Sequence, residues 1–193
     1  MATRWGSVLW VVAVWLALLA IWVVAFFRDP IRPGPRGDRY VVAAAEGHVV
    51  HISEVDEPMY VKERTVRISI FLSVFDVHVN RYPVSGPVEL LHYNKGKFLH
   101  AGGEKASLEN EQSSIGIRGP RGPVLVRQIA GLIARRIVTD AKPGDRARQG
   151  ERLGLIRFGS RTDVFLPLSA RAEVKVKPGD RVRVGGTVLA EYP

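Results

Sequence analysis

Cysteine is absent from the 193 residues of the chain, and acidic residues are scarce. Without cysteine, a disulfide scaffold, a thiolate nucleophile and a Cys-ligated metal site are excluded. Asp and Glu number 19 against 28 Lys and Arg, which gives a net charge of +9. Strongly basic chains usually bind nucleic acid or an anionic membrane surface. Nucleic-acid binding should bring aromatic residues interleaved with the basic ones and a recognisable module, but the sequence shows neither, and its positive charge is spread along the chain as isolated arginines. We therefore expect no nucleic-acid partner and attribute the charge to attraction by a phospholipid membrane.

One long stretch carries no charge. Ser7–Phe27 reads SVLWVVAVWLALLAIWVVAFF. As a helix it spans about 31 Å, which matches the hydrocarbon thickness of a bilayer. We expect a tail at residues 1–6 and a transmembrane helix at residues 7–27. A cleaved signal peptide is the alternative, but its apolar region is normally shorter, and Ala25-Phe26-Phe27 is a poor cleavage site.

The charges that flank this stretch predict its orientation. One arginine, Arg4, precedes it, whereas four follow: Arg28, Arg32, Arg36 and Arg39. The positive-inside rule places the C-terminal body on the cytoplasmic side of the cell (inner) membrane, behind a single span. Residues 28–39 contain three Pro and two Gly and predict a stiff basic linker at the lipid headgroups.

Residues 40–193 predict one mainly β domain. Short apolar runs alternate with Gly and Pro turns, which is typical of a β-rich sandwich or a partly closed barrel. One helix is expected in this domain, over Leu125–Ile137, although Gly131 weakens it.

A repeat lies within this domain. Lys142-Pro143-Gly144-Asp145-Arg146 recurs as Lys177-Pro178-Gly179-Asp180-Arg181, and Pro-Gly-Asp is turn chemistry between strands. The pattern resembles the turn of biotinyl- and lipoyl-type barrel-sandwich domains. Those carriers modify a lysine at a hairpin tip, and no lysine occurs between Lys142 and Lys175. We therefore interpret the repeat as architecture.

The periodicity of one stretch changes along its length. Apolar residues occupy the even positions over residues 66–74, and then the even positions become Asp76, His78 and Asn80. Since strand side chains alternate between faces, either a bulge lies near Phe75 or three polar groups project into a site.

Three stretches resemble phosphatidylserine decarboxylases, particularly their short bacterial and archaeal form. They are Phe27-Arg28-Asp29-Pro30-Ile31-Arg32, then Phe75-Asp76-Val77-His78-Val79-Asn80-Arg81 with Pro83 and Gly86, and Ile156-Arg157-Phe158-Gly159-Ser160-Arg161-Thr162-Asp163-Val164-Phe165-Leu166-Pro167. The resemblance covers about residues 27–193.

The resemblance implies an enzyme that cuts itself between Gly159 and Ser160 into chains 1–159 and 160–193. Ser160 then becomes a covalent pyruvoyl cofactor, an electron sink for converting phosphatidylserine to phosphatidylethanolamine. His78 matches a family active-site histidine and is our candidate for proton transfer. We assign substrate binding to Arg81, Asn80 and Asp76, with Arg81 as a clamp for carboxylate or phosphate.

One position departs from the family pattern. Family members usually carry an Asp-Gly pair whose Asp belongs to an Asp-His-Ser set proposed for self-cleavage. Here Glu46-Gly47 stands in that place, so we assign a catalytic role to Glu46, whose carboxylate is one methylene further from the backbone. Asn110-Glu111 falls where the family has an Asn-Glu pair.

Other interpretations stay open at this stage. A non-catalytic membrane-tethered adaptor on the same scaffold is the alternative that Glu46 favours. A decarboxylase of another serine phospholipid, such as archaetidylserine, has identical headgroup chemistry. The remaining histidines at 48, 51, 92 and 100 show no metal-site spacing, so we predict no metal. The sequence is compatible with a homo-oligomer.

Overall fold

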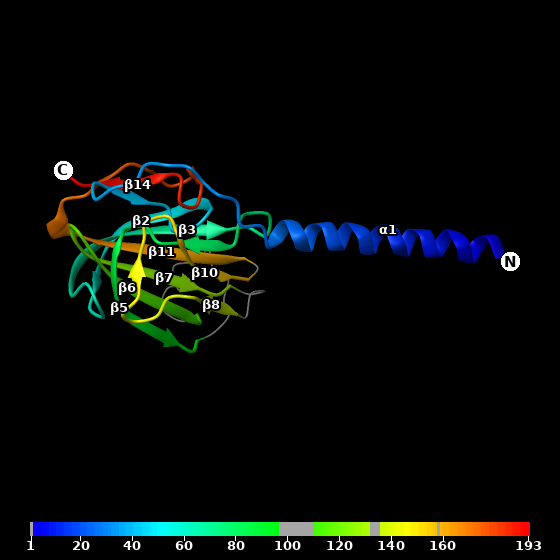
Figure 1. The fold of residues 1–193 in the computed structure, drawn as a ribbon, viewed down its shortest axis with the longest axis horizontal. Coiled ribbons are helices and arrows are strands. Elements are labelled where there is room, and N and C mark those ends of the chain that lie inside the picture. Colours follow the sequence, from blue (N-terminus) through cyan, green and yellow to red (C-terminus); the bar gives the residue numbers. More distant parts are fainter. Residues whose placement is uncertain (1, 97–109, 132–135, 158) are drawn as a thin grey trace.

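The computed structural model describes residues 2–96, 110–131, 136–157 and 159–193, and within them one long helix precedes a β-rich body (Figure 1). The helix α1 spans Ala2–Phe26. The strands are β1 (Tyr40–Val42), β2 (Gly47–Glu57), β3 (Glu63–Leu72), β4 (Val79–Arg81), β5 (Gly86–Asn94), β6 (Gln112–Gly119), β7 (Gly122–Ile129), β8 (Ile137–Thr139), β9 (Arg146–Ala147), β10 (Arg152–Ile156), β11 (Ser160–Pro167), β12 (Glu173–Val174), β13 (Arg181–Val182) and β14 (Val188–Glu191), with a 3-10 turn, η1, at Leu168–Ala170. The mainly β prediction is confirmed.

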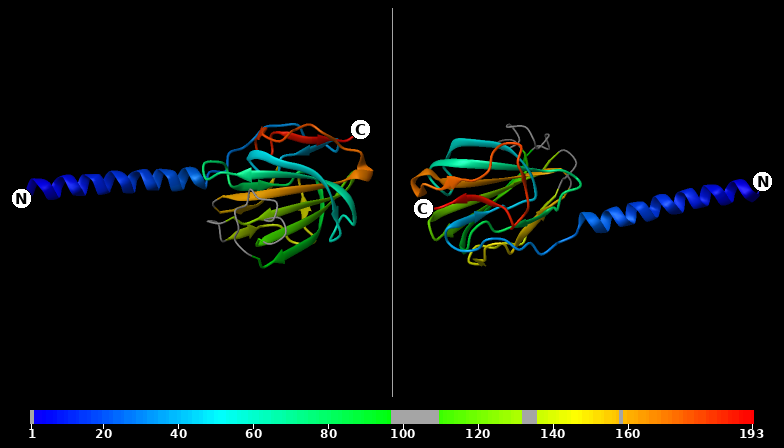
Figure 2. Two further views of the ribbon diagram at one scale, coloured as in Figure 1. Left: turned by 180° about the vertical axis from the view of Figure 1, so that it is seen from behind. Right: turned by 90° about the horizontal axis from the view of Figure 1, so that it is seen from above.

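The helix α1 projects away from the body, as the two further views also show (Figure 2). Its segment Ser7–Phe26 is long and apolar enough to cross a membrane. Pro30 follows shortly after its end, and further prolines at 33 and 35 keep the next residues out of helix.

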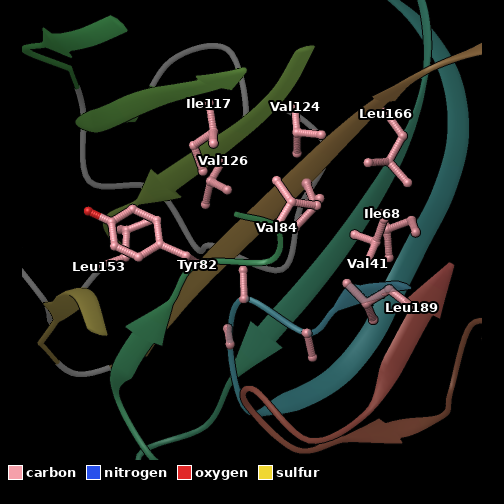
Figure 3. Close-up of a cluster of buried hydrophobic side chains, with 14 of the residues drawn as sticks. Val41, Ile68, Tyr82, Val84, Ile117, Val124, Val126, Leu153, Leu166 and Leu189 are labelled. Carbon is pink, nitrogen blue, oxygen red and sulfur yellow. The ribbon is translucent and has the colours of Figure 1, made fainter. Parts of the chain in front are cut away.

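Most of the body is one curled sheet. Its eight strands run in the order β13-β2-β3-β11-β7-β6-β5-β9, and two three-stranded sheets accompany it, β1-β14-β12 and β4-β10-β8. The main core lies between the curled sheet and the small sheets, and draws on Ile68, Val126 and Leu166 from the former and Val41 and Leu189 from the latter (Figure 3). The partly closed barrel is therefore the form that the predicted β architecture takes.

The repeat closes both edges of the curled sheet. Each copy forms a turn in which the Asp carboxylate accepts a hydrogen bond from the Lys backbone N–H, at 2.9 Å in both copies. The first copy leads into β9, which pairs with β5, and the second into β13, which pairs with β2. These two short strands are the terminal strands of the eight-stranded order, which agrees with an architectural role.

The helix expected over Leu125–Ile137 is wrong. Leu125 lies within β7, which pairs with β11 on one side and β6 on the other, and Ile137 begins β8. The continuous run Val124-Leu125-Val126 is fully buried because both faces of β7 are covered. Such a run has no two-residue alternation, so its pattern does not separate strand from helix. Residues 132–135 lie outside the described residues.

The change of periodicity at Phe75 marks a turn between two sheets. Strand β3 ends at Leu72, and the chain then turns, with the Asp76 carboxylate accepting hydrogen bonds from Ser73 N at 2.8 Å and Ser73 Oγ at 2.7 Å. It continues as β4, which belongs to a different sheet. The turn replaces the expected bulge, and Asp76, His78 and Asn80 are all buried.

The segment after α1 lies against the body. Arg28 donates to Phe75 O at 2.9 Å, Arg32 pairs with Glu46 at 2.9 Å, and Arg36 donates to Gly185 O at 2.7 Å. The last of the four arginines, Arg39, pairs with Glu191 at 2.7 Å. The basic side chains of this linker therefore bind protein groups as well as adding positive charge at the end of α1.

Candidate active site

The dipeptide Gly159-Ser160 lies where the chain passes from a small sheet into the curled sheet. Strand β10 ends at Ile156, and β11 begins at Ser160, which pairs with Leu72 of β3. Gly159 has φ +61°, in the left-handed region that side-chain-bearing residues rarely adopt. A residue with a Cβ would be strained there whatever the space around it. Phe158, quoted in the matching stretch, lies outside the described residues.

The Ser160 side chain is buried, and among the described residues it has no hydrogen-bond partner. Its exposed fraction is 0%, and no group among the described residues bonds to its Oγ. Along β11, Ser160 and Thr162 share a face with Val164 and Leu166, which belong to the main core. An unpaired buried hydroxyl costs free energy, so its presence in a well-packed strand indicates a use other than stability.

His78 is held in one tautomer, and one ring nitrogen has no partner among the described residues. Its Nδ1 lies 2.9 Å from Asp76 O, and because a carbonyl only accepts, Nδ1 carries the proton. Its Nε2 therefore presents a lone pair, and within the described ranges nothing bonds to it. The side chain is 2% exposed, and the Phe26 ring packs on it with centroids 4.1 Å apart.

Burial lowers the pKa of His78 to about 4, because the charged imidazolium is poorly solvated there. The hydrogen bond to the Asp76 backbone and the Asp76 charge act in the opposite direction, and the Arg28 charge lowers the pKa further. His78 is therefore a neutral base at physiological pH.

Backbone contacts bring His78 beside the segment that leads to Gly159-Ser160. Ile156 N donates to His78 O at 3.2 Å, and Leu155 of β10 is the register partner of Val79 of β4. Ser160 in turn pairs with Leu72, the last residue before the turn to His78. Two chain segments thus connect the buried hydroxyl and the buried imidazole at one end of the curled sheet.

A cavity of about 280 Å³ opens beside His78. It is lined by Phe26, Phe27, His78, Val79, Arg152 and Leu155. The cavity thus combines apolar walls, one cation and the proposed base. A hollow of about 350 Å³ at the β2–β3 turn has no candidate residue in its lining and is set aside.

Asn80 lies in a buried polar network. Its Nδ2 donates to Ala44 O at 3.3 Å and to Thr162 Oγ1 at 3.2 Å, and its Oδ1 accepts from Gln128 Nε2 at 2.8 Å. Gln128 then accepts from Thr139. The network joins β4, β7 and β11, so it positions the strand that begins with Ser160.

Glu46 and Arg81 both bind the linker. The Glu46 carboxylate pairs with Arg32, and in the described part of the chain it forms no hydrogen bond or ion pair with His78. Arg81 pairs with Asp29 and donates to Gly150 O at 2.8 Å and Pro30 O at 3.3 Å. Neither residue lines the cavity beside His78. The carboxylate whose charge acts on His78 is that of Asp76.

Sequence reasoning gave no functional role to four of the cavity residues: Phe26, Phe27, Arg152 and Leu155. The signal for the first two was their place at the end of the apolar run, where Phe27 also opens the first stretch that carries the resemblance. Within the described residues, no group of three His, Asp or Glu side chains lies together as a metal site, and His100 lies outside those residues. Asn110 is buried and donates to Ala130 O at 2.8 Å, which is a structural contact.

Comparison with known proteins finds a consistent set of relatives. The sequence model of the family described as phosphatidylserine decarboxylase matches residues 19–190. A phosphatidylserine decarboxylase proenzyme of Symbiobacterium thermophilum is 51% identical over 95% of this chain and 85% of its own length. Proenzymes of the same name from Carboxydothermus hydrogenoformans and Aromatoleum aromaticum are 49% and 46% identical, over 91% and 95% of this chain and 84% of each relative.

Proposed function

Because this chain belongs to the phosphatidylserine decarboxylase family, we propose that it cuts itself between Gly159 and Ser160 and then decarboxylates phosphatidylserine to phosphatidylethanolamine. One observation carries the proposal for this chain's own residues. A fully buried Ser160 hydroxyl follows a glycine with φ +61°, and a neutral histidine lies on the neighbouring segment; within the described part of the chain, neither the hydroxyl nor the histidine Nε2 has a hydrogen-bond partner.

The cut uses groups that the chain itself supplies. His78 Nε2 takes the Ser160 hydroxyl proton, and Oγ attacks the Gly159 carbonyl carbon. The peptide C–N bond breaks as the proton returns to the amine, which leaves an ester between Gly159 and the Ser160 oxygen. Loss of the Ser160 Cα proton expels the Gly159 carboxylate, so chain 1–159 is released. Water then replaces the amino group of residue 160, and ammonia leaves.

The residues present fit a pyruvoyl group at position 160. The end of β11 is buried, its hydroxyl has no structural partner among the described residues, and the preceding glycine places no side chain over it. When formed, the group supplies an electron sink for the electrons left by loss of CO₂. His78 lines a cavity of its own and is our candidate to hold and move the proton that completes the product.

The cavity beside His78 is the proposed headgroup site. Its aromatic and aliphatic walls exclude water, and Arg152 offers a cation to the phosphate or carboxylate of the substrate. Arg152 is paired with Asp140 at 2.7 Å, so it is already oriented. Asp76, Asn80 and Arg81 have protein partners in this structure, and their assignment to substrate binding stays a prediction.

The site lies at the end of the proposed membrane anchor. With α1 spanning the cell (inner) membrane and the arginines after it on the cytoplasmic side, the cavity walled by Phe26 and Phe27 lies near the level of the lipid headgroups. The substrate then reaches the site from the leaflet in which the anchor ends.

Intact-mass spectrometry of the purified full-length protein tests the proposal. We expect two chains, 1–159 and 160–193, the smaller lighter by one ammonia than a peptide that begins with Ser. The mass of the larger chain also shows whether the apolar helix is retained or removed as a signal peptide. Ser160→Ala should give one uncut, inactive chain, whereas Ser169→Ala, at an exposed turn serine, should cut normally. Full-rate decarboxylation by Ser160→Ala would contradict the proposal.

The same purified full-length protein distinguishes two alternative functions. An uncut wild-type chain would leave the membrane-tethered adaptor, the function favoured by the Glu46 departure, and Glu46→Asp would then be the first reversion to make. A cut chain that fails on phosphatidylserine but releases CO₂ from archaetidylserine would identify another serine phospholipid as its substrate.

A further inference from the structure

The last helical residue of α1 is buried in the body. From residue 7 to residue 25 the side chains of α1 are exposed or half-buried, as expected for a helix that faces lipid. Phe26 is only 2% exposed, and its ring lies 4.1 Å from the His78 ring at a tilt of 35°. A tether alone does not require this contact.

We propose that Phe26 is a positioning residue of the active site, which excludes water from the His78 ring and keeps its Nε2 lone pair available for the Ser160 proton. The proposal rests on the proposed function for its chemical consequence, but the contact itself is independent of the cut.

The physical argument starts from solvation. Burial is the largest cause of the lowered pKa of His78, and Phe26 supplies one face of that burial. A truncated side chain at position 26 would admit water from the adjoining cavity, which Phe26 also lines. The imidazolium would then be hydrated, and its pKa would rise toward the ordinary value of about 6.5.

Charged groups near His78 act in both directions. Asp76 lies on the same turn, Arg28 follows α1, and Arg152 of β10 lines the same cavity. Asp76 favours the imidazolium and Arg28 opposes it. None of these charged groups is removed when Phe26 is changed. A shift in the titration midpoint of His78 therefore reports that the Phe26 ring no longer shields the imidazole from water.

The position of Phe26 is itself held. Arg28 donates to Ala25 O at 2.7 Å at the end of the helix and to Phe75 O at 2.9 Å on the turn before His78. Phe27 contacts Phe26 edge-on with ring centroids 5.0 Å apart. The membrane helix and the turn that carries His78 are thus joined directly, and the anchor forms a wall of the site.

The test is a titration of His78 in the full-length, uncut Ser160→Ala chain in lipid nanodiscs. Histidine labelled with ¹³C at Cε1 gives one signal for each of the five histidines, and the His78 signal is the one lost in His78→Gln. With Phe26 present we expect His78 to stay neutral down to about pH 5. In Phe26→Ala we expect its midpoint to rise by at least about one pH unit.

Matched variants distinguish the loss of the Phe26 ring over His78 from general damage to the fold. Val24→Ala removes an apolar side chain of α1 that is 74% exposed, and it should leave the His78 midpoint unchanged. Phe26→Leu retains part of the cover and should give an intermediate midpoint. The midpoints of the other histidines should not move. Should Phe26→Ala not fold, Phe26→Val carries the same expectation with a smaller rise.

A second readout is the rate of cutting. It uses the chain that retains Ser160, synthesised cell-free in the presence of nanodiscs. If the His78 midpoint in Phe26→Ala reaches the ordinary value of about 6.5, cutting should be about tenfold slower at pH 5.5 than at pH 7.5, whereas a midpoint of about 5 should slow it by less than about twofold. Val24→Ala should cut at similar rates at the two pH values. An unchanged His78 midpoint in a folded Phe26 variant would overturn the inference. A shifted midpoint in a chain whose wild type never cuts would uphold the contact and reject the proposed function.

Discussion

At the residue scale, His78 combines two demands that oppose each other. Its Nδ1 proton is donated to Asp76 O, which fixes the ring, while its Nε2 has no partner among the described residues and is buried. A base needs this lone pair free, but a buried neutral histidine destabilises the fold when the pH falls. The burial that keeps the His78 lone pair available is thus also the cause of the lower folding stability at low pH.

We predict a stability difference with a definite sign. The pKa of His78 is about 6.5 in the unfolded chain and about 4 in the folded chain, so the unfolded state binds more protons between these values. Stability contributed by neutral His78 is therefore present above about pH 6.5 and falls toward pH 4, by about 3 kcal/mol at most. Urea unfolding of uncut Ser160→Ala in detergent, at several pH values, measures this loss.

The control variants use the same background. His78→Gln should flatten the curve between about pH 6.5 and pH 4, because it removes the titrating group. His92→Gln, at an exposed position, should keep the wild-type slope. A His78→Gln curve parallel to that of the reference would mean that burial does not lower this pKa.

The catalytic role expected for Glu46 stays a prediction, and the structure shows a contact that tests it. It is 5% exposed and bound to Arg32 of the linker. We predict that Glu46→Gln and Arg32→Met slow cutting to the same extent, and that the double variant adds little, because both remove one contact. Cutting rates of the three variants measure the coupling. A loss of cutting in Glu46→Gln alone would instead support the catalytic role expected from the sequence.

At the element scale, β11 carries different chemistry on its two faces. Ser160 and Thr162 face the main core and the network through Asn80. On the opposite face Arg161 and Asp163 form a fully buried ion pair at 2.7 Å, and Arg161 also donates to Ser69 Oγ of β3 at 2.8 Å. A shift of one residue in register would exchange these faces, so the pair and the network together specify the position of Ser160.

This arrangement predicts the effect of breaking the pair. Asp163→Asn removes the carboxylate charge that lies 2.7 Å from the buried Arg161, and we expect a loss of about 3 to 5 kcal/mol in unfolding free energy. Replacing both residues, as Arg161→Met with Asp163→Leu, should cost much less. Denaturant unfolding of the uncut Ser160→Ala forms measures both. A double variant as unstable as Asp163→Asn would exclude the uncompensated charge as the cause.

At the scale of the whole molecule, residues 160–193 are interleaved with the rest. They supply β11 in the middle of the curled sheet, β13 at its edge and β14 beside β1, and each pairs with a strand that precedes the proposed cut. A cut after Gly159 therefore removes a covalent link without removing any of these strand pairings. The helix α1, in contrast, meets the body at one end only, through Phe26 and the linker arginines (Figure 2).

Much of this organisation was predictable from local pattern. The uncharged run at residues 7–27 predicts a spanning helix from length and composition alone, and the Pro-Gly-Asp repeats predict turns because their backbone chemistry is local. The buried run in β7 was misassigned to a helix, since covering of both faces depends on residues distant in the sequence. The flanks of Gly159-Ser160 and the His78 stretch carried the family resemblance by themselves.

The sequence by itself determined the apolar helix long enough to cross a membrane, the mainly β body, the family and the place of the proposed cut, because each depends on neighbouring residues. Tertiary structure alone decided the partners of the charged and aromatic groups. It paired Glu46 with Arg32, Arg81 with Asp29 and Arg161 with Asp163, and it placed Phe26 on His78. The physical reason is that desolvation and charge pairing depend on distances in space, which local sequence pattern does not record.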